Sequence, residues 1–167
     1  MSQIFHFENC FSTNDEILSL LNEDESTAVF TFNQTKGRGQ YGNIWKVIPN
    51  QNLAYSIAIK TSNIRISDTF LNYYTAIIVR DFLANLTNAS CKIKWPNDII
   101  LNGKKGCGIL IEKEKVENVE YYILGIGINV LQTDFTNLPK AGSVLTATDL
   151  SFDLKEFTNQ FHQYFIS

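Results

Sequence analysis

The sequence predicts an α+β fold, with a mixed, largely antiparallel β-sheet and helices packed on one face. Short runs of strand-forming residues outnumber the helical segments, and several neighbouring runs are separated by tight-turn signals. Long helical periodicity is confined to residues 68–86 and 154–165. The chain has 167 residues, of which 44% are hydrophobic and 13% aromatic, so it is long enough to bury the core of one domain.

The N-terminal part combines strands with a short helix and a glycine-rich loop. Alternating or β-branched side chains predict strands at residues 3–8, 27–33 and 53–60. Ser12 and Asp15 form a weak capping box before an apolar run, which predicts a helix over residues 14–22. Residues 34–42 form the loop, because glycines and polar side chains dominate there.

The C-terminal part predicts hairpins between two amphipathic helices. Its predicted strands are residues 92–94, 99–101, 108–112 and 121–130. Asn102-Gly103 lies between two of them and is a strong signal for a tight hairpin turn. The apolar residues of the segments 68–86 and 154–165 recur at helical spacing, so both predict helices that face a core.

Composition and charge exclude several classes of protein. The net charge of −3 gives no indication of non-specific binding to nucleic acid. The N-terminus lacks the features of a signal peptide, and no apolar run approaches the roughly 18 residues of a membrane span. Cys10, Cys91 and Cys107 are widely spaced, which predicts neither a disulfide framework nor a zinc site. We therefore expect a cytoplasmic domain that binds neither nucleic acid nor membrane.

Residues 37–42, Gly-Arg-Gly-Gln-Tyr-Gly, fit the pattern G-x-G-x-x-G. A dinucleotide fingerprint would need a helix directly after the glycines and an acidic residue about 20 positions later, and the sequence offers neither. The glycines still let backbone N–H groups approach an anion, and Arg38 adds a forked cation suited to carboxylate or phosphate. A plain surface loop is an equal alternative.

Three further segments place polar groups where a ligand could lie. Residues 94–98, Lys-Trp-Pro-Asn-Asp, end in an amide and a carboxylate, and Asp98 could hold Mg²⁺ through water. Residues 104–108, Lys-Lys-Gly-Cys-Gly, set a cation beside glycines that allow close approach to the backbone. Residues 125–129, Gly-Ile-Gly-Ile-Asn, end an apolar strand on an amide that needs a partner. An Asx-type turn and a solvated strand edge are the structural alternatives for the first two.

The sequence shows no nucleophile–base pair and no pair of carboxylates. Cys107, His6 and His162 are interpreted as packing residues. Electrostatics and positioning are the remaining catalytic tools, and these suit adenylyl or phosphoryl transfer.

Taken in order, these segments resemble the catalytic domain of the biotin–protein ligases, members of the biotin/lipoate ligase family. The resemblance covers most of the chain. It rests on Ser-Thr-Asn at 12–14, Gln34, Gly-Arg-Gly at 37–39, Trp45, Lys-Trp-Pro-Asn-Asp at 94–98, Lys-Gly-Cys-Gly-Ile-Leu-Ile-Glu at 105–112 and Gly-Ile-Gly-Ile-Asn at 125–129. It implies ATP-dependent activation of biotin to biotinyl-5′-AMP, followed by transfer to a lysine of a biotin carboxyl carrier protein.

The resemblance also implies roles for individual residues. Lys105 and Arg38 would be the catalytic cations, which neutralise the biotin carboxylate and the α-phosphate. The residues expected to bind biotin are Ser12, Thr13, Asn14, Gln34, Gly37, Arg38, Gly39, Gln40, Lys105 and Gly108. The residues expected to bind ATP are Trp45, Lys94, Asn97, Asp98 and Asn129. Asp98 would also position Mg²⁺, and Asn14 would cap its helix.

The chain departs from the family pattern in three places. Gln40 stands where many members carry arginine. About ten residues precede the Ser-Thr-Asn motif, so we expect no N-terminal DNA-binding domain, and we also expect the C-terminal β-domain of the family to be absent. The expected organisation is one catalytic domain over residues 1–167. The alternatives are a lipoate–protein ligase and a biotin-binding module that has lost transfer activity; a homodimer is also an open alternative.

Overall fold

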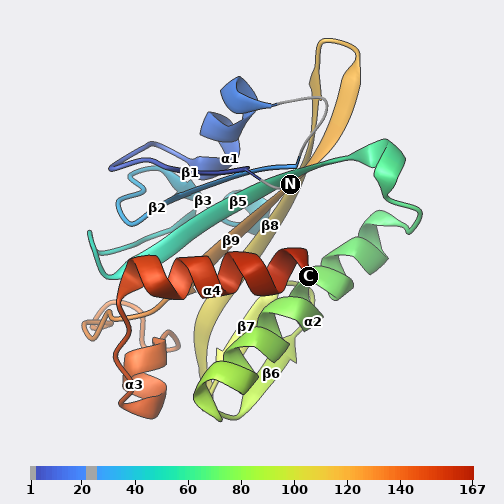
Figure 1. Cartoon of the computed structure of the whole chain (residues 1–167). Coiled ribbons are helices and arrows are strands. Elements are labelled where there is room, and N and C mark those ends of the chain that lie inside the picture. The colour runs from blue at the N-terminus through green and yellow to red at the C-terminus, as the bar shows by residue number, and fades with distance from the viewer. Residues whose placement is uncertain (1–2, 22–25) are drawn as a thin grey trace.

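The computed structural model describes residues 3–21 and 26–167. These residues form a seven-stranded sheet in the order β1-β2-β5-β9-β8-β7-β6, with two long helices across one face (Figure 1). The strands are β1 (Gln3–His6), β2 (Thr27–Thr31), β5 (Asn52–Lys60), β6 (Cys91–Lys94), β7 (Asp98–Leu101), β8 (Lys104–Val116) and β9 (Val119–Asn129). Among these strands β1 and β2 pair in parallel and the other neighbours are antiparallel. The predicted fold class is therefore confirmed.

The helices α2 (Asp68–Thr87) and α4 (Leu154–Ile166) cover the same face of the sheet. Between helices and sheet lies a core of aliphatic and aromatic side chains that includes Tyr55, Phe82 and Phe161. The ring of Phe161 lies 5.1 Å from that of Tyr55 and 5.2 Å from that of Phe82, centroid to centroid. Edge-on packing of this kind adds to the free energy gained by burial.

The opposite face carries a smaller apolar cluster near one end of the sheet. Its cover is α1 (Thr13–Glu16) and the 3₁₀ turn η1 (Ile17–Leu20). Ile17 is completely buried against side chains that include Val29 and Ile123. This short element is the exception to the expectation that the helices share one face.

The predicted helix over residues 14–22 is shorter and less regular than its pattern suggests, and residue 22 lies outside the described residues. Ser12 occupies the N-cap position, but its side chain makes no capping hydrogen bond. The predicted capping box is therefore wrong. The backbone carbonyl of Ser12 instead accepts from the N–H groups of Asp15 and Glu16.

The hairpin at Asn102-Gly103 is confirmed, since both residues have the positive φ that a tight two-residue turn requires. The strand expected at 108–112 extends over residues 104–116 and forms a long hairpin with β9. Two further features were not predicted from the sequence: the helix α3 (Val144–Thr148) and the small hairpin of β3 (Gly37–Arg38) and β4 (Ile44–Trp45).

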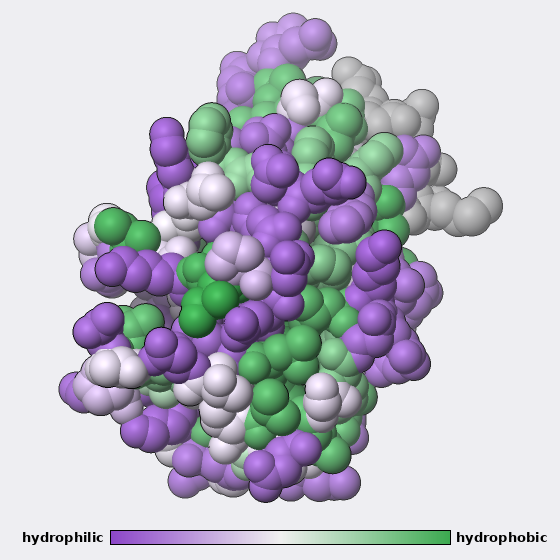
Figure 2. Space-filling view, turned by 90° about the vertical axis from the view of Figure 1, so that its left-hand side faces the viewer, coloured by the Kyte–Doolittle hydropathy of each residue, from purple (hydrophilic) through white to green (hydrophobic). Residues whose placement is uncertain are grey.

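Seen from the left of Figure 1, the surface is largely hydrophilic, with smaller apolar areas between the polar side chains (Figure 2). None of the helices in the described part of the chain is long and apolar enough to cross a membrane.

Candidate active site

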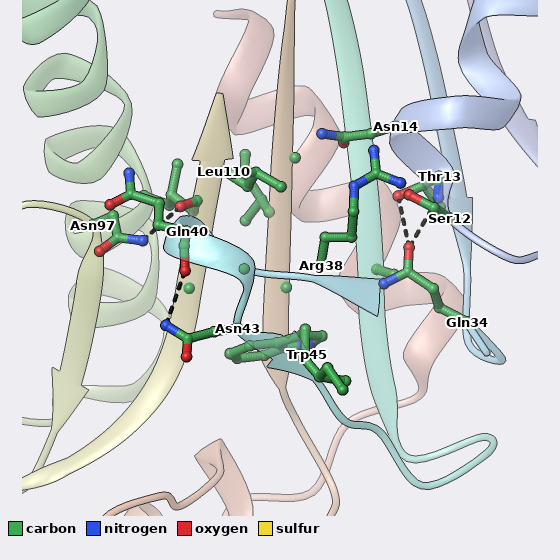
Figure 3. Close-up of a pocket in the computed structure, with 18 of the residues that line it drawn as sticks. Ser12, Thr13, Asn14, Gln34, Arg38, Gln40, Asn43, Trp45, Asn97 and Leu110 are labelled. Carbon is green, nitrogen blue, oxygen red and sulfur yellow. Dashed lines mark hydrogen bonds between the residues drawn. The ribbon is translucent and has the colours of Figure 1, made fainter. Parts of the chain in front are cut away.

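Most of the residues selected from the sequence line one cavity on the sheet face opposite α2 and α4 (Figure 3). They come from α1 and the residue before it, the loop after β2, the hairpin of β3 and β4, the turn before β7, and strands β7 and β8. The selected residues that line it are Ser12, Thr13, Asn14, Gln34, Arg38, Gly39, Gln40, Trp45, Asn97, Asp98, Lys105 and Gly108. The fold thus gathers segments that lie far apart in the sequence.

Glycines of β8 and β9 form the floor of this cavity. A Cβ atom on Gly125 would lie 2.4 Å from Asn14 Oδ1, and one on Gly127 would lie 2.5 Å from Trp45 Nε1. A Cβ on Gly108, which pairs with Gly127 across the strands, would lie 2.9 Å from the Trp45 ring. The missing side chains allow Asn14 and Trp45 to lie directly on the sheet, and they leave the backbone open to a ligand.

One end of the cavity is lined by uncharged polar side chains that are hydrogen-bonded to one another; we call it the neutral end. The backbone N–H of Thr13 donates to Gln34 Oε1 over 2.9 Å, and the Thr13 hydroxyl lies 3.3 Å from the same atom. The buried Ser56 hydroxyl lies 2.7 Å from Thr13 Oγ1 and 2.6 Å from Asn14 Oδ1. These contacts fix the side chains before any ligand arrives, as precise recognition requires.

Asn14 is not a helix cap. Its side chain is buried beneath the helix, where Nδ2 donates to Glu112 Oε2 over 2.6 Å. Ser56 and Glu112 were not selected as site residues from the sequence. Two sequence features could have identified them: Ser56 is a polar residue inside the apolar strand 53–60, and Glu112 directly follows the apolar run 109–111.

The other end of the cavity carries a charged pair. Lys105 Nζ lies 2.7 Å from Asp98 Oδ1, and 35% of the lysine side chain is exposed against 16% of the aspartate side chain. The backbone of Lys105 is fixed as well, because its N–H donates to the Lys140 carbonyl and its carbonyl accepts from the Gly142 N–H. A cation is thereby held near the glycine floor, 5.5 Å from the ring centroid of Trp45.

Arg38 lies at the rim and already has two carboxylate partners. Its Nη1 and Nη2 donate to the two carboxylate oxygens of Asp15 over 2.7 and 2.8 Å. Nη2 also lies 3.1 Å from Glu112 Oε2. The hydrogen bond between Arg38 and Asp15 lowers the pKa of the Asp15 carboxyl and raises the pKa of the Arg38 guanidinium. In the structure, the partners of this guanidinium are therefore carboxylates of the protein itself, whereas the sequence predicted an anion of the bound ligand.

Three of the residues that the sequence predicted to bind biotin or ATP do not line the cavity. Lys94 is an exposed residue of β6, whereas Gly37 is buried where a Cβ would lie 2.6 Å from Gln34 Nε2. Asn129 is 5% exposed, and its Nδ2 donates to the Gly142 carbonyl over 3.0 Å. Its Oδ1 is buried and has no hydrogen-bond partner among the described residues.

Cys107 is buried behind the floor, and this burial raises the pKa of its thiol. A thiol that resists ionisation is a poor nucleophile, which agrees with the interpretation of Cys107 as a packing residue.

Fold and cavity together define an α+β domain whose candidate site is built on a glycine-lined sheet face. Residues 8–129 match the sequence profile of the "Biotin/lipoate A/B protein ligase family", and the chain belongs to this family.

Two curated relatives and one solved structure illustrate the relationship. The bifunctional ligase/repressor BirA of Bacillus subtilis (strain 168) is 35% identical over 112 residues, which are 66% of this chain and 34% of the relative. The biotin–[acetyl-CoA-carboxylase] ligase of Paracoccus denitrificans is 33% identical over 137 residues, 80% of this chain and 55% of the relative. The chain thus spans about a third to about half of these proteins.

The solved structure is the biotin protein ligase from Aquifex aeolicus in complex with biotin and ATP. It superposes with a TM-score of 0.83 at 25% identity, over 98% of this chain and 68% of that one.

Proposed function

We propose that this chain is the catalytic domain of a biotin–protein ligase. It would activate biotin with ATP to biotinyl-5′-AMP and transfer biotin to a lysine of a biotin carboxyl carrier protein. The observation that carries the proposal is the composition of the cavity, in which a neutral polar end, a glycine floor and a lysine–aspartate pair face one space. The similarity to proteins named as biotin ligases supports it.

The neutral end suits the ureido ring of biotin, which offers one carbonyl acceptor and two N–H donors. Gln34 uses Oε1 to accept from Thr13, which leaves its Nε2 as a donor for a ligand carbonyl. The Ser12 hydroxyl can donate or accept, and the Thr13 hydroxyl, which donates to Gln34 Oε1 and accepts from Ser56, keeps one lone pair for a ligand N–H. The ureido ring is neutral, so no charge is needed at this end.

The charged end suits the reacting atoms. In the first step a carboxylate oxygen of biotin bonds to the α-phosphorus of ATP, while the bond to pyrophosphate breaks. Lys105 would stabilise the negative charge that gathers on the α-phosphate oxygens. In the second step the carrier amine bonds to the acyl carbon, loses a proton and displaces AMP. Neither step needs a nucleophilic side chain, in agreement with the residues gathered here.

We propose Asp98 as the carboxylate that meets Mg²⁺ when the nucleotide is bound. Asp98 lines the cavity beside Lys105 and offers one carboxylate to it. This suits magnesium, which usually takes one or two carboxylates and fills its shell with water and phosphate oxygens. We also propose that Asn129, although it does not line the cavity, contacts the nucleotide, because its Oδ1 has no hydrogen-bond partner among the described residues.

The test is a transfer assay with biotin, ATP and Mg²⁺, read by mass spectrometry with and without a biotin carrier domain, and with lipoate in parallel. The proposal predicts biotinyl-AMP without carrier and a biotinylated carrier lysine when carrier is added. Adenylate without transfer would instead indicate a biotin-binding module, and adenylate from lipoate alone would indicate a lipoate ligase.

A further inference from the structure

A continuous set of side-chain contacts joins the glycine loop to the neutral end of the cavity. Each contact links residues that lie at least 21 positions apart in the sequence. In order, the members are Gln34, Thr13, Ser56, Asn14, Glu112, Arg38 and Asp15. The loop is thereby connected to the side chains that we assign to biotin.

Arg38 is the residue by which the loop takes part. It lies in β3 at the start of the segment 37–42, and its fork contacts Asp15 on α1 and Glu112 on β8. The contact with Asp15 uses two parallel hydrogen bonds, the geometry that makes an arginine–carboxylate pair directional. Arg38 thus attaches the loop to two elements, α1 and β8, that are distant from it in the sequence.

The two carboxylates differ in how firmly they are held. Glu112 is 29% exposed and accepts from the buried Asn14 over 2.6 Å. Asp15 is 53% exposed, and its carboxylate pairs with Arg38 at 2.7 Å. Both lie close to the same guanidinium, so they would repel each other if Arg38 withdrew. Closure of the loop supplies the charge that this pair of anions requires.

We propose that Asp15 and Glu112 are positioning residues that hold Arg38, and with it residues 37–42, closed over the cavity. They touch no reacting atom, and they act through Arg38. The contact is half-exposed, so it is weak enough to open when ligands arrive and leave. If the proposed function is correct, the closed loop encloses an acyl adenylate, which water would otherwise hydrolyse. This part of the inference rests on the proposed function.

The first test uses the ligand-free protein and trypsin, because Arg38-Gly39 is itself a cleavable bond. Asp15→Asn and Glu112→Gln should each speed cleavage there by ~3–5-fold, the scale of a half-exposed ion pair. Glu114→Gln, an exposed neighbour on the same strand, should leave the rate unchanged. Asp15→Glu should restore most of the protection.

Salt separates this role from a merely structural one. Raising salt should speed cleavage of the wild-type loop, because exposed ion pairs are screened. The same salt should have a much smaller effect on Asp15→Asn. Equal cleavage of wild type and both variants, or an unchanged salt response in Asp15→Asn, would overturn the proposal.

A second readout concerns catalysis. Asp15→Asn should raise the KM for biotin and the carrier-independent release of biotinyl-AMP by ~3–5-fold, with little change in kcat. A lower kcat at unchanged KM would overturn the positioning role. If the wild-type protein forms no adenylate, the proposed function fails, and the cleavage experiment still decides whether the two carboxylates hold the loop.

Discussion

The two faces of the sheet are built from the same strands but are filled in opposite ways. Along β9, Tyr122, Leu124 and Ile126 point to the face that α2 and α4 cover, and each is at most 6% exposed. The alternating positions Gly125 and Gly127 point to the other face and carry no side chain. One strand therefore contributes large apolar groups to the core and bare backbone to the cavity.

This difference separates stability from ligand binding within a single layer of residues. Burial of apolar surface on the helical face supplies the free energy of folding. The glycine face gives up packing so that polar side chains and a ligand can approach the backbone. Substitutions on the two faces should therefore have different consequences, although the residues concerned are sequence neighbours.

The largest effect is expected on the helical face. Phe161→Ala should lower the free energy of unfolding by about 3–5 kcal/mol, because the ring is fully buried between Tyr55 and Phe82. Urea unfolding measures this change. Phe70→Ala, at a ring that is 64% exposed, should cost under about 0.5 kcal/mol. Weaker biotin binding by the folded Phe161→Ala protein would contradict the separation of the two faces.

The next effect concerns catalysis at the cavity. Lys105→Ala should slow biotinyl-AMP formation by at least ~10²-fold, the scale of one lost charge-stabilising contact. Its stability should change little, since the side chain is partly exposed. Lys104→Ala is the matched control, because Lys104 lies next to it and contacts the Pro139 carbonyl outside the cavity. Equal rates for the two variants would remove Lys105 from the mechanism.

A smaller effect should follow from adding one carbon to the floor. Gly127→Ala would place a Cβ 2.5 Å from Trp45 Nε1, so the ring must move into the space meant for the ligand. The affinity for ATP, measured by calorimetry, should fall by ~10-fold, because Trp45 is one of the residues assigned to ATP; this is in line with the cost of overpacking. Trp45→Leu in the same chain should recover part of the loss. An unchanged affinity in the single variant would show that the floor does not contact the ligand.

The smallest effect is a pH dependence on the helical face. His162 is 2% exposed, and its Nδ1 lies 2.8 Å from the Tyr55 hydroxyl. Burial lowers the pKa of this imidazole below its ordinary 6.5. As the pH falls below about 6.5, the unfolded chain takes up a proton that the folded chain resists, so stability is lost by at most about 1.4 kcal/mol per pH unit. His162→Gln should remove this slope in urea titrations between pH 7.5 and 5.

Local signals predicted the elements that carry their own pattern. The helix at 68–87 and the turn at Asn102-Gly103 follow from periodicity and turn chemistry. The hairpin of β3 and β4 was not predicted, because each of its strands has two residues, which are too few to show the alternation of apolar and polar side chains that marks a strand. Ser12 and Asp15 matched a capping box, but Asp15 pairs with Arg38 instead. A contact across 23 positions competes with the local one, and no local pattern encodes it.

The same limit applies to the site. Motif residues such as Gln34, Asp98 and Lys105 were predicted, and the structure brings them to one cavity. Ser56 and Glu112 were missed because their importance arises from partners 42 and 98 positions away. Lys94 and Asn129 were selected with their motifs, yet they do not line the cavity.

The most direct test of the central claim is native mass spectrometry of the protein after incubation with biotin, ATP and Mg²⁺. The account predicts a bound species with the mass of biotinyl-AMP in the wild-type protein and in folded Phe161→Ala. It predicts that this species is strongly reduced in Lys105→Ala and in Gly127→Ala. Undiminished adenylate in both cavity variants would contradict the claim that the glycine face forms the site of the reaction.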